Sequence, residues 1–221
     1  MSNLIDDTYF KGVISLPVAQ QDSANYDKLI ADTQRDILIK ALGYDLYKQF
    51  ITAIEGGSPA QKWIDIKDGK EYNVEDSKGR TVLVKWPGLV NDEKISLLAY
   101  FSFYNILEYL NYKNNPTGTT KGKNENSIAA GNNIVNRRMS RAYNLGVELY
   151  GVDISYHSGE RAILRGRKYR ESISKFSQFD YYQEILKGTL YNMIYFANLE
   201  TPDTYTNWNF TPIETINEFG I

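Results

Sequence analysis

Hydrophobic residues recur at helical spacing over residues 26–42, where apolar side chains fall three or four positions apart. Asp22 and Ser23, a few residues upstream of this run, can cap the start of a helix. Gly43 can adopt the left-handed conformation that ends a helix. The pattern then predicts a second, short helix over residues 44–54, before a pair of glycines.

Residues 92–112 are apolar almost all round, and their narrow polar stripe includes Asn105 and Glu108. A membrane-spanning helix needs about 20 apolar residues, whereas the apolar residues here extend only from Ile95 to Leu110 and are interrupted by those two side chains. We therefore predict a central, buried helix with Asn91 as its cap.

Two further helices are predicted after a polar loop over residues 114–130. The first is amphipathic and ends near Tyr150, and Arg137 and Arg141 lie on its polar face. The second is long and spans residues 178–199.

The hydrophobic period changes to two between Trp63 and Trp86, which predicts a three-stranded antiparallel meander. Its turns are marked by Asp68 with Gly69 and by residues 76–79. An isolated small sheet has open edges and little core. We therefore expect this meander, from Trp63 to Trp86, to contact a neighbouring molecule and not only its own helices.

Both ends of the chain lack these regular patterns. Residues 1–22 are predicted as an extended N-terminal arm and residues 200–221 as a C-terminal docking arm, on either side of a core over residues 23–199 with a β insertion at 63–86. The predicted fold class is mostly α: a helical bundle with a small antiparallel β meander insertion and extended N- and C-terminal arms.

Six apolar side chains suit the C-terminal arm for docking. Their burial contributes on the order of 10 kcal/mol, at roughly 1.5–3 kcal/mol each. Ordering the backbone costs more than that, at about 1–2 kcal/mol per residue. The arm therefore needs backbone hydrogen bonds from a groove or a sheet edge, which we expect a neighbouring subunit or another partner to supply. The alternative is that the arm packs on its own helices. The candidate contacts are Trp208, Phe210, Ile213, Ile216, Phe219 and Ile221.

Composition is ordinary for a globular protein, since 42% of the 221 residues are hydrophobic and 24% are charged. The formal net charge of −2 gives no global field that would attract nucleic acid or an anionic membrane. Tyrosine is abundant, with 18 residues, and tyrosine suits surfaces that are buried against other proteins. The first residues carry no secretory signal pattern, which favours synthesis in a cytoplasm.

Candidate catalytic chemistry is sparse. The absence of cysteine excludes disulfides and thiolate nucleophiles, and His157, the only histidine, excludes a multi-histidine metal site. Residues 118–124 imitate a phosphate-binding loop, but their glycines are one position too close and Asn124 replaces the hydroxyl that holds magnesium. We predict no catalytic residues, no cofactor, no metal site and no enzyme activity.

One basic cluster stands out over residues 160–175, where six basic residues oppose two acidic ones. Such a run is either a solvated surface or a contact with DNA phosphates or with an acidic neighbouring subunit. The candidate contacts, together with the two arginines of the amphipathic helix, are Arg137, Arg141, Arg161, Arg165, Arg167, Lys168 and Arg170.

Several short motifs occur in an order that resembles a known family. They are Leu-Pro-Val-Ala-Gln at 16–20, Ala-Leu-Gly-Tyr-Asp-Leu-Tyr at 41–47, Trp-Pro-Gly-Leu at 86–89, Lys-Asn-Glu-Asn at 123–126 and Ile-Asn-Glu-Phe-Gly-Ile at 216–221. Together they resemble the head-to-tail connector, or adaptor, proteins of tailed bacteriophages that infect Bacteroidetes, such as crAss-like phages.

The resemblance implies a structural virion protein at the head–tail junction. It implies a helical-bundle subunit that forms a homo-oligomeric ring, a dodecamer, beneath the portal protein and above a tail protein or second adaptor, with DNA passing through its channel and no membrane partner. Two alternatives stay open: a DNA-binding or packaging accessory protein, and a tail-associated cell-wall hydrolase. Salt-dependent binding of duplex DNA by the free monomer would favour the accessory protein.

Overall fold

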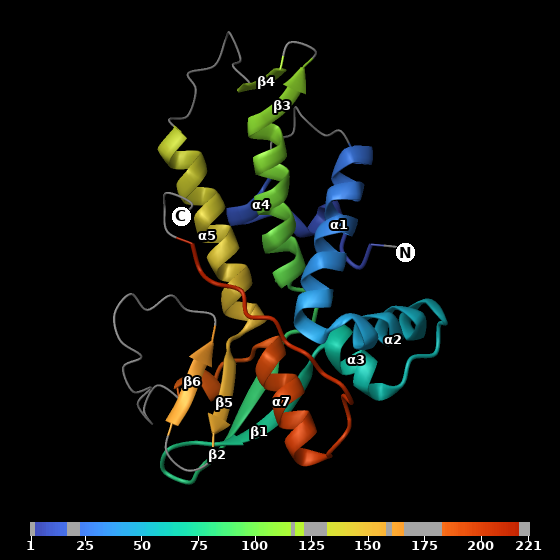
Figure 1. The fold of residues 1–221 in the computed structure, drawn as a ribbon, viewed down its shortest axis with the longest axis vertical. Coiled ribbons are helices and arrows are strands. Elements are labelled where there is room, and N and C mark those ends of the chain that lie inside the picture. Colours follow the sequence, from blue (N-terminus) through green and yellow to red (C-terminus); the bar gives the residue numbers. More distant parts are fainter. Residues whose placement is uncertain are drawn as a thin grey trace.

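The computed structural model describes residues 3–16, 23–115, 118–121, 132–157, 161–165 and 183–216. Three helices lie side by side along the long axis of the molecule: α1 (Ser23–Leu42), α4 (Leu97–Asn111) and α5 (Asn132–Tyr150) (Figure 1). Small two-stranded antiparallel sheets accompany them. The predicted fold class, a mostly α helical bundle with a small β insertion, is confirmed.

The central position of α4 is confirmed. Leu98, Phe103 and Ile106 are fully buried, and the helix packs between α1 and α5 (Figure 1). Where α4 meets α5, a Cβ atom at position 146 would lie 3.1 Å from the Phe101 ring. Because Gly146 has no side chain, the two helices can approach closely.

The start of α4 differs from the prediction, because Asn91 binds a loop and not the helix. Its side chain accepts a hydrogen bond from the Ile95 amide at 3.0 Å and donates one to the Ile95 carbonyl at 2.6 Å. The hydroxyl of Ser96 instead accepts from the Leu98 amide. The helix therefore begins at Leu97.

The boundary between α1 and α2 (Tyr44–Glu55) is as predicted, since Gly43 adopts a φ of +80° there. The next element is α3 (Gln61–Asp68), where a strand was predicted. Alternation of Ile64 with Ile66 suggested a strand, but Trp63 and Ile66, three residues apart, are the buried pair and fit one face of a helix. The three-stranded meander is therefore wrong, and a two-stranded hairpin follows α3 instead.

That hairpin joins β1 (Lys70–Glu75) to β2 (Thr81–Trp86). The predicted turn at residues 76–79 is confirmed, and the Asp76 carboxylate accepts hydrogen bonds from the amides of Lys78 and Arg80. At the other end, a side chain on Gly88 would lie 2.5 Å from the Asp68 carbonyl carbon. The close approach of these two backbones holds α3 against the end of β2.

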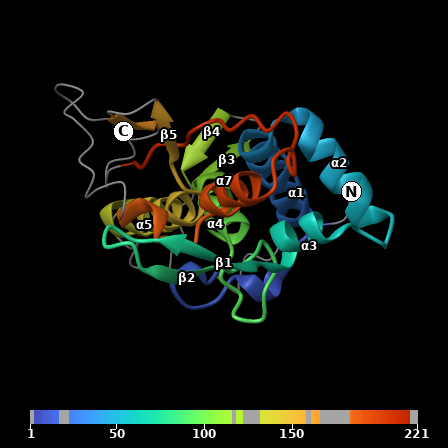
Figure 2. The ribbon, with the colours of Figure 1, turned by 90° about the horizontal axis from the view of Figure 1, so that it is seen from below.

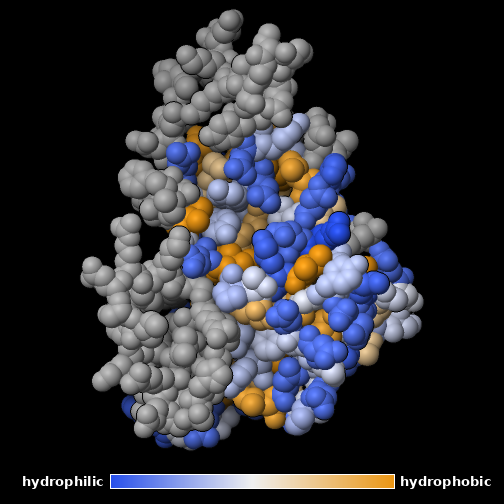
Figure 3. Space-filling model, viewed as in Figure 1, coloured by the Kyte–Doolittle hydropathy of each residue, from blue (hydrophilic) through white to orange (hydrophobic). Residues whose placement is uncertain are grey.

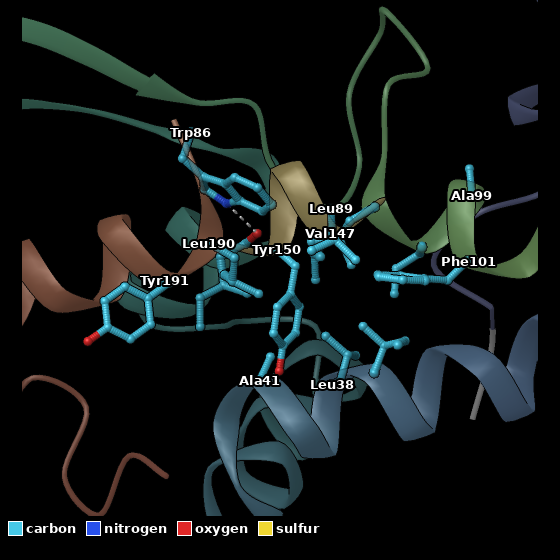
Figure 4. Close-up of a cluster of buried hydrophobic side chains, with 14 of the residues drawn as sticks. Leu38, Ala41, Trp86, Leu89, Ala99, Phe101, Val147, Tyr150, Leu190 and Tyr191 are labelled. Atoms are coloured by element: carbon cyan, nitrogen blue, oxygen red, sulfur yellow. Dashed lines mark hydrogen bonds between the residues drawn. The ribbon is translucent and has the colours of Figure 1, made fainter. Parts of the chain in front are cut away.

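Both tryptophans of this region belong to the core of their own chain. Trp86 is fully buried, and its indole N–H donates to the Ile66 carbonyl at 3.1 Å, close to Leu190 and Tyr150 (Figure 4). Trp63 is also buried, between the rings of Phe50 and Tyr205. The two tryptophans therefore stabilise their own subunit, while the expectation that the region between them contacts a neighbouring molecule stays a prediction.

The last helix is shorter than predicted. It is α7 (Leu190–Glu200), and the hydroxyl of Thr189 caps it by accepting from the Asn192 amide at 3.1 Å. Just before it, Gly188 lies so close to β2 that a side chain there would overlap the Lys85 carbonyl oxygen. Because the chain passes this close to β2, it does not form the one continuous helix that the apolar pattern predicted. Residues 178–182 lie outside the described part of the chain.

Two further hairpins were not predicted. β3 (Tyr112–Asn115) continues directly from α4 and pairs with β4 (Gly118–Lys121), inside the predicted polar loop. β5 (Asp153–His157) follows α5 and pairs with β6 (Arg161–Arg165). Figure 1 shows β3–β4 at one end of the long axis and β1–β2 and β5–β6 towards the other.

The N-terminal arm is not extended where it is described. It forms two short 3-10 helices, η1 (Asp7–Tyr9) and η2 (Gly12–Ile14). Tyr9 and Ile14 are buried, because the apolar residues that made the arm stand out are used to cover the helical bundle. Residues 17–22 of the predicted arm lie outside the described residues.

Candidate interaction surface

A C-terminal strap (residues 204–216) runs across the bundle and holds three helices together (Figure 2). It begins on α3, where the buried Tyr205 hydroxyl donates to the Lys62 carbonyl at 2.8 Å and the Lys62 ammonium donates to the Thr204 carbonyl at 3.0 Å. From there it continues past the end of α1 to α5.

The strap completes the hydrogen bonding at the C-terminal end of α1. The last four carbonyl groups of an α-helix have no partner inside the helix. In α1, the Ile39 carbonyl accepts from the Gly43 amide at 2.8 Å. The other three accept from the strap: Lys40 from the Thr211 amide at 2.7 Å, Ala41 from the Trp208 indole at 2.8 Å, and Leu42 from the Asn209 amide at 3.3 Å.

On α5 the strap is bound by two side chains. The Asn144 amide donates to the Ile216 carbonyl at 2.8 Å and accepts from the Ile216 amide at 2.9 Å. The Tyr150 hydroxyl donates to the Thr211 carbonyl at 2.7 Å, and the Tyr150 ring stacks on Phe210 with 4.8 Å between centroids. Burial raises the pKa of Tyr150, so the hydroxyl keeps the proton it donates.

These contacts show which surface the candidate docking residues bind. Trp208, Phe210 and Ile213 pack against their own subunit, and the Ile216 backbone is held by α5. The expectation that a neighbouring subunit supplies the backbone hydrogen bonds is wrong for residues 209, 211 and 216, because α1 and α5 supply them. Phe219 and Ile221 lie outside the described residues.

The candidate basic residues do not form one cluster in the described part of the chain. Arg137 and Arg141 are exposed, one turn apart on α5. Arg161 and Arg165 lie at the two ends of β6, in register with His157 and Asp153. The remaining candidates, Arg167, Lys168 and Arg170, lie outside the described residues.

One arginine that the sequence did not single out has a clear structural role. Arg138 donates to the carbonyls of Val13 at 2.9 Å and Ser15 at 2.7 Å, and its guanidinium lies 5.2 Å from the centroid of the Phe103 ring. It therefore fastens the N-terminal segment to α4 and α5. Its neighbours in sequence, Arg137 and Asn136, are exposed.

A groove of about 640 Å³ lies between α1 and α4 and was not predicted from the sequence. Figure 3 shows hydrophobic residues in separate patches among hydrophilic ones on this face. The floor of the groove is apolar and its rim is polar, and Asn105 on α4 donates to Thr33 on α1 across it at 2.7 Å. The lining residues are Leu29, Asp32, Thr33, Asp36, Ile37, Lys40, Phe101, Asn105, Glu108, Tyr109, Tyr143 and Ile213.

The rim of this groove is acidic, because three carboxylates, on Asp32, Asp36 and Glu108, oppose one lysine, a local net charge of −2. Asp36 pairs with Lys40 at 2.6 Å and Asp32 pairs with Lys28 at 2.8 Å, and all four side chains are well exposed. Exposed pairs of this kind contribute little, about 0–1 kcal/mol each. The carboxylates are therefore open to exchange these lysines for other cations.

The described residues contain no group of three histidine, cysteine, aspartate or glutamate side chains that could hold a metal ion. Within the same residues, no helix has both the length and the apolar character that crossing a membrane requires. No protein-family model, curated protein or solved structure matches the chain.

Proposed function

We propose that this protein is a structural subunit of a tailed-phage virion, which forms a ring between the portal protein and the tail and surrounds the DNA channel. The proposal combines the resemblance to phage adaptor proteins with the arrangement of the hairpins. It includes a location at the head–tail junction and a binding role without catalysis.

The observation that carries the proposal is the presence of sheet edges at both ends of the long axis. β3–β4 extends beyond the end of α4, and β1–β2 lies towards the opposite end (Figure 1). Among the described strands, none of these hairpins pairs with a third strand. Two-stranded hairpins are marginal alone, and their open edges favour pairing with other chains.

A helical bundle with pairing edges at both ends suits a subunit with one neighbour above it and another below it. The helices α1, α4 and α5 form a rigid spacer between these ends, since their contact faces are fully buried. The portal protein would bind one end, and a tail protein or second adaptor would bind the other.

The experiment is a mass measurement of the purified chain, alone and with the portal protein of the same phage. We expect a monomer alone and a complex with twelve copies when the portal is present. Mass spectrometry of purified virions should also detect the chain. Absence from virions together with no association with the portal would contradict the proposal.

The alternative of a DNA-binding accessory protein has one observation in its favour, which is the placement of Arg161 and Arg165 on one strand. It predicts that the free monomer binds duplex DNA and that the binding weakens steeply with salt. The ring proposal requires no such binding by the monomer. The cell-wall hydrolase has no specific observation in its favour.

A further inference from the structure

We infer that the groove between α1 and α4 is the lateral contact of the ring, and that it binds the basic segment beginning with β6 of a second copy of this chain. This assignment rests on the proposed function, because it identifies the contact between neighbouring subunits.

The groove and the segment have complementary charges. The groove rim carries Asp32, Asp36 and Glu108 against the single Lys40, while residues 160–175 carry six basic and two acidic residues. Lys28 pairs with Asp32 beside the groove, so the rim keeps a net charge of −1 and attracts a segment of net +4, although the whole chain has a net charge of only −2.

The apolar parts of the two surfaces also correspond. Ile37, Phe101 and Ile213 give the groove an apolar floor beneath the acidic rim. Residues 161–165 read Arg-Ala-Ile-Leu-Arg, so apolar residues lie between the two cations. An apolar centre with a charged rim is the usual composition of a specific contact between proteins.

The two surfaces lie apart on one subunit. Figure 1 places β5–β6 beyond the end of α5, away from α1, whereas the groove lies between α1 and α4. Complementary patches at separate places on one molecule form heterologous, head-to-tail contacts, and such contacts generate closed rings when the rotation between copies closes.

The cations that pair with the groove carboxylates can also be replaced by cations of another subunit. Lys28 and Lys40 lie beside Asp32 and Asp36 on the surface of α1, where replacement of one cation by another is easy. On the opposite wall, the exposed Glu108 has no ion pair with any described residue. A neighbouring arginine would therefore gain a carboxylate partner on each wall.

The test uses charge reversal in the full chain, with the number of copies per complex measured by native mass spectrometry in the presence of the portal protein. One variant reverses the groove (Asp32→Lys, Asp36→Lys, Glu108→Lys). The other reverses the segment (Arg161→Glu, Arg165→Glu, Arg167→Glu). We expect each variant alone to lose lateral association at least tenfold, because like charges then face each other.

Restoration is the decisive result. An equimolar mixture of the two variants should associate again, since each groove then meets a segment of opposite charge, and so should one chain that carries all six changes. A milder variant (Asp32→Asn, Asp36→Asn, Glu108→Gln) should weaken association less than the reversal. Thermal melting checks that every variant is folded.

The matched control reverses three exposed acids that lie away from both the groove and the hairpins, Asp92, Glu93 and Glu200, and it should associate as the wild type does. If the wild type forms rings and the groove variants form them equally well, the inference is overturned and the proposed function stands. If loss occurs without restoration in the mixture, the inference is also overturned. If the wild type never self-associates, with or without portal, the inference and the proposed function both fail.

Discussion

The indole N–H of Trp208 donates a 2.8 Å hydrogen bond to the carbonyl of Ala41, in the last turn of α1. Ala41 is fully buried, so its carbonyl has no access to water. The strap thus supplies a partner that the helix cannot supply for itself, and this pairing gives the first prediction.

Trp208→Phe keeps an aromatic ring and removes the donor. We expect it to lower the free energy of unfolding by about 1–3 kcal/mol, the cost of leaving a buried acceptor unpaired. Asn209→Ala is the control, because its hydrogen bond to Leu42 comes from the backbone amide. Urea unfolding measures both, and equal losses would show that the indole bond is not the cause.

Two glycines with positive φ allow the cost of an unfavourable backbone conformation to be compared with the cost of that conformation plus a steric clash. Gly57 has a φ of +74° and no atom within 4 Å of the position that a methyl group would occupy, whereas at Gly88, with a φ of +90°, a methyl would meet the Asp68 backbone at 2.5 Å. We expect Gly57→Ala to cost roughly 1–2 kcal/mol. Gly88→Ala should cost more, on the order of 4 kcal/mol, because of the added clash. Similar thermal melting temperatures for the two variants would contradict this.

Asp76 gives the hairpin β1–β2 a defined pH dependence. Hydrogen bonds from the side chain and the backbone amide of Arg80, and then from the Lys78 amide, lower the pKa of Asp76 to about 2, against an ordinary value of 3.8. Between these values the unfolded chain binds the proton more readily, so stability is present above pH 3.8 and is lost as the pH falls towards 2.

Asp76→Asn should remove that loss, so its free energy of unfolding should change less with pH than that of the wild type between about pH 4 and 2. The free energy at each pH comes from urea unfolding curves. Glu71→Gln removes a charge from the exposed face of the same hairpin and should keep the wild-type slope. A wild-type slope in Asp76→Asn would exclude this carboxylate as the source.

Arg138 is expected to hold the N-terminal segment in place. Arg138→Ala removes the donor to the carbonyls of Val13 and Ser15, and should cost about 1.5–3 kcal/mol. Amides of residues 9–14 should exchange their hydrogens faster. Arg141→Ala, at an exposed position one turn further along α5, should stay within about 0.5 kcal/mol of the wild type. Equal exchange in both variants would argue against the role of Arg138.

The long helices were predictable because local rules were sufficient for them. Gly43 marks the end of α1 in the sequence and adopts the expected conformation in the structure. In α3, by contrast, Ile64 with Ile66 fits a strand and Trp63 with Ile66 fits a helix. A segment of eight residues is too short for the two periods to be told apart.

The candidate surfaces were harder to predict because they combine distant parts of the chain. The sequence identified the basic segment, whose charges lie close together along the chain. It did not identify the groove, since Asp32 and Glu108 line the same groove only because α1 packs against α4. Nor did it identify the partners of the strap, because nothing near Trp208 indicates that its indole binds Ala41.

The bond between Trp208 and Ala41 can form only late in synthesis, because 167 positions separate the two residues. A ribosome that adds about 5–20 residues per second makes the end of α1 wait roughly 8–33 s for its partner. During that interval the carbonyl groups at the end of α1 face water or other chains. A nascent chain thus acquires its finished surface only when the strap has been translated.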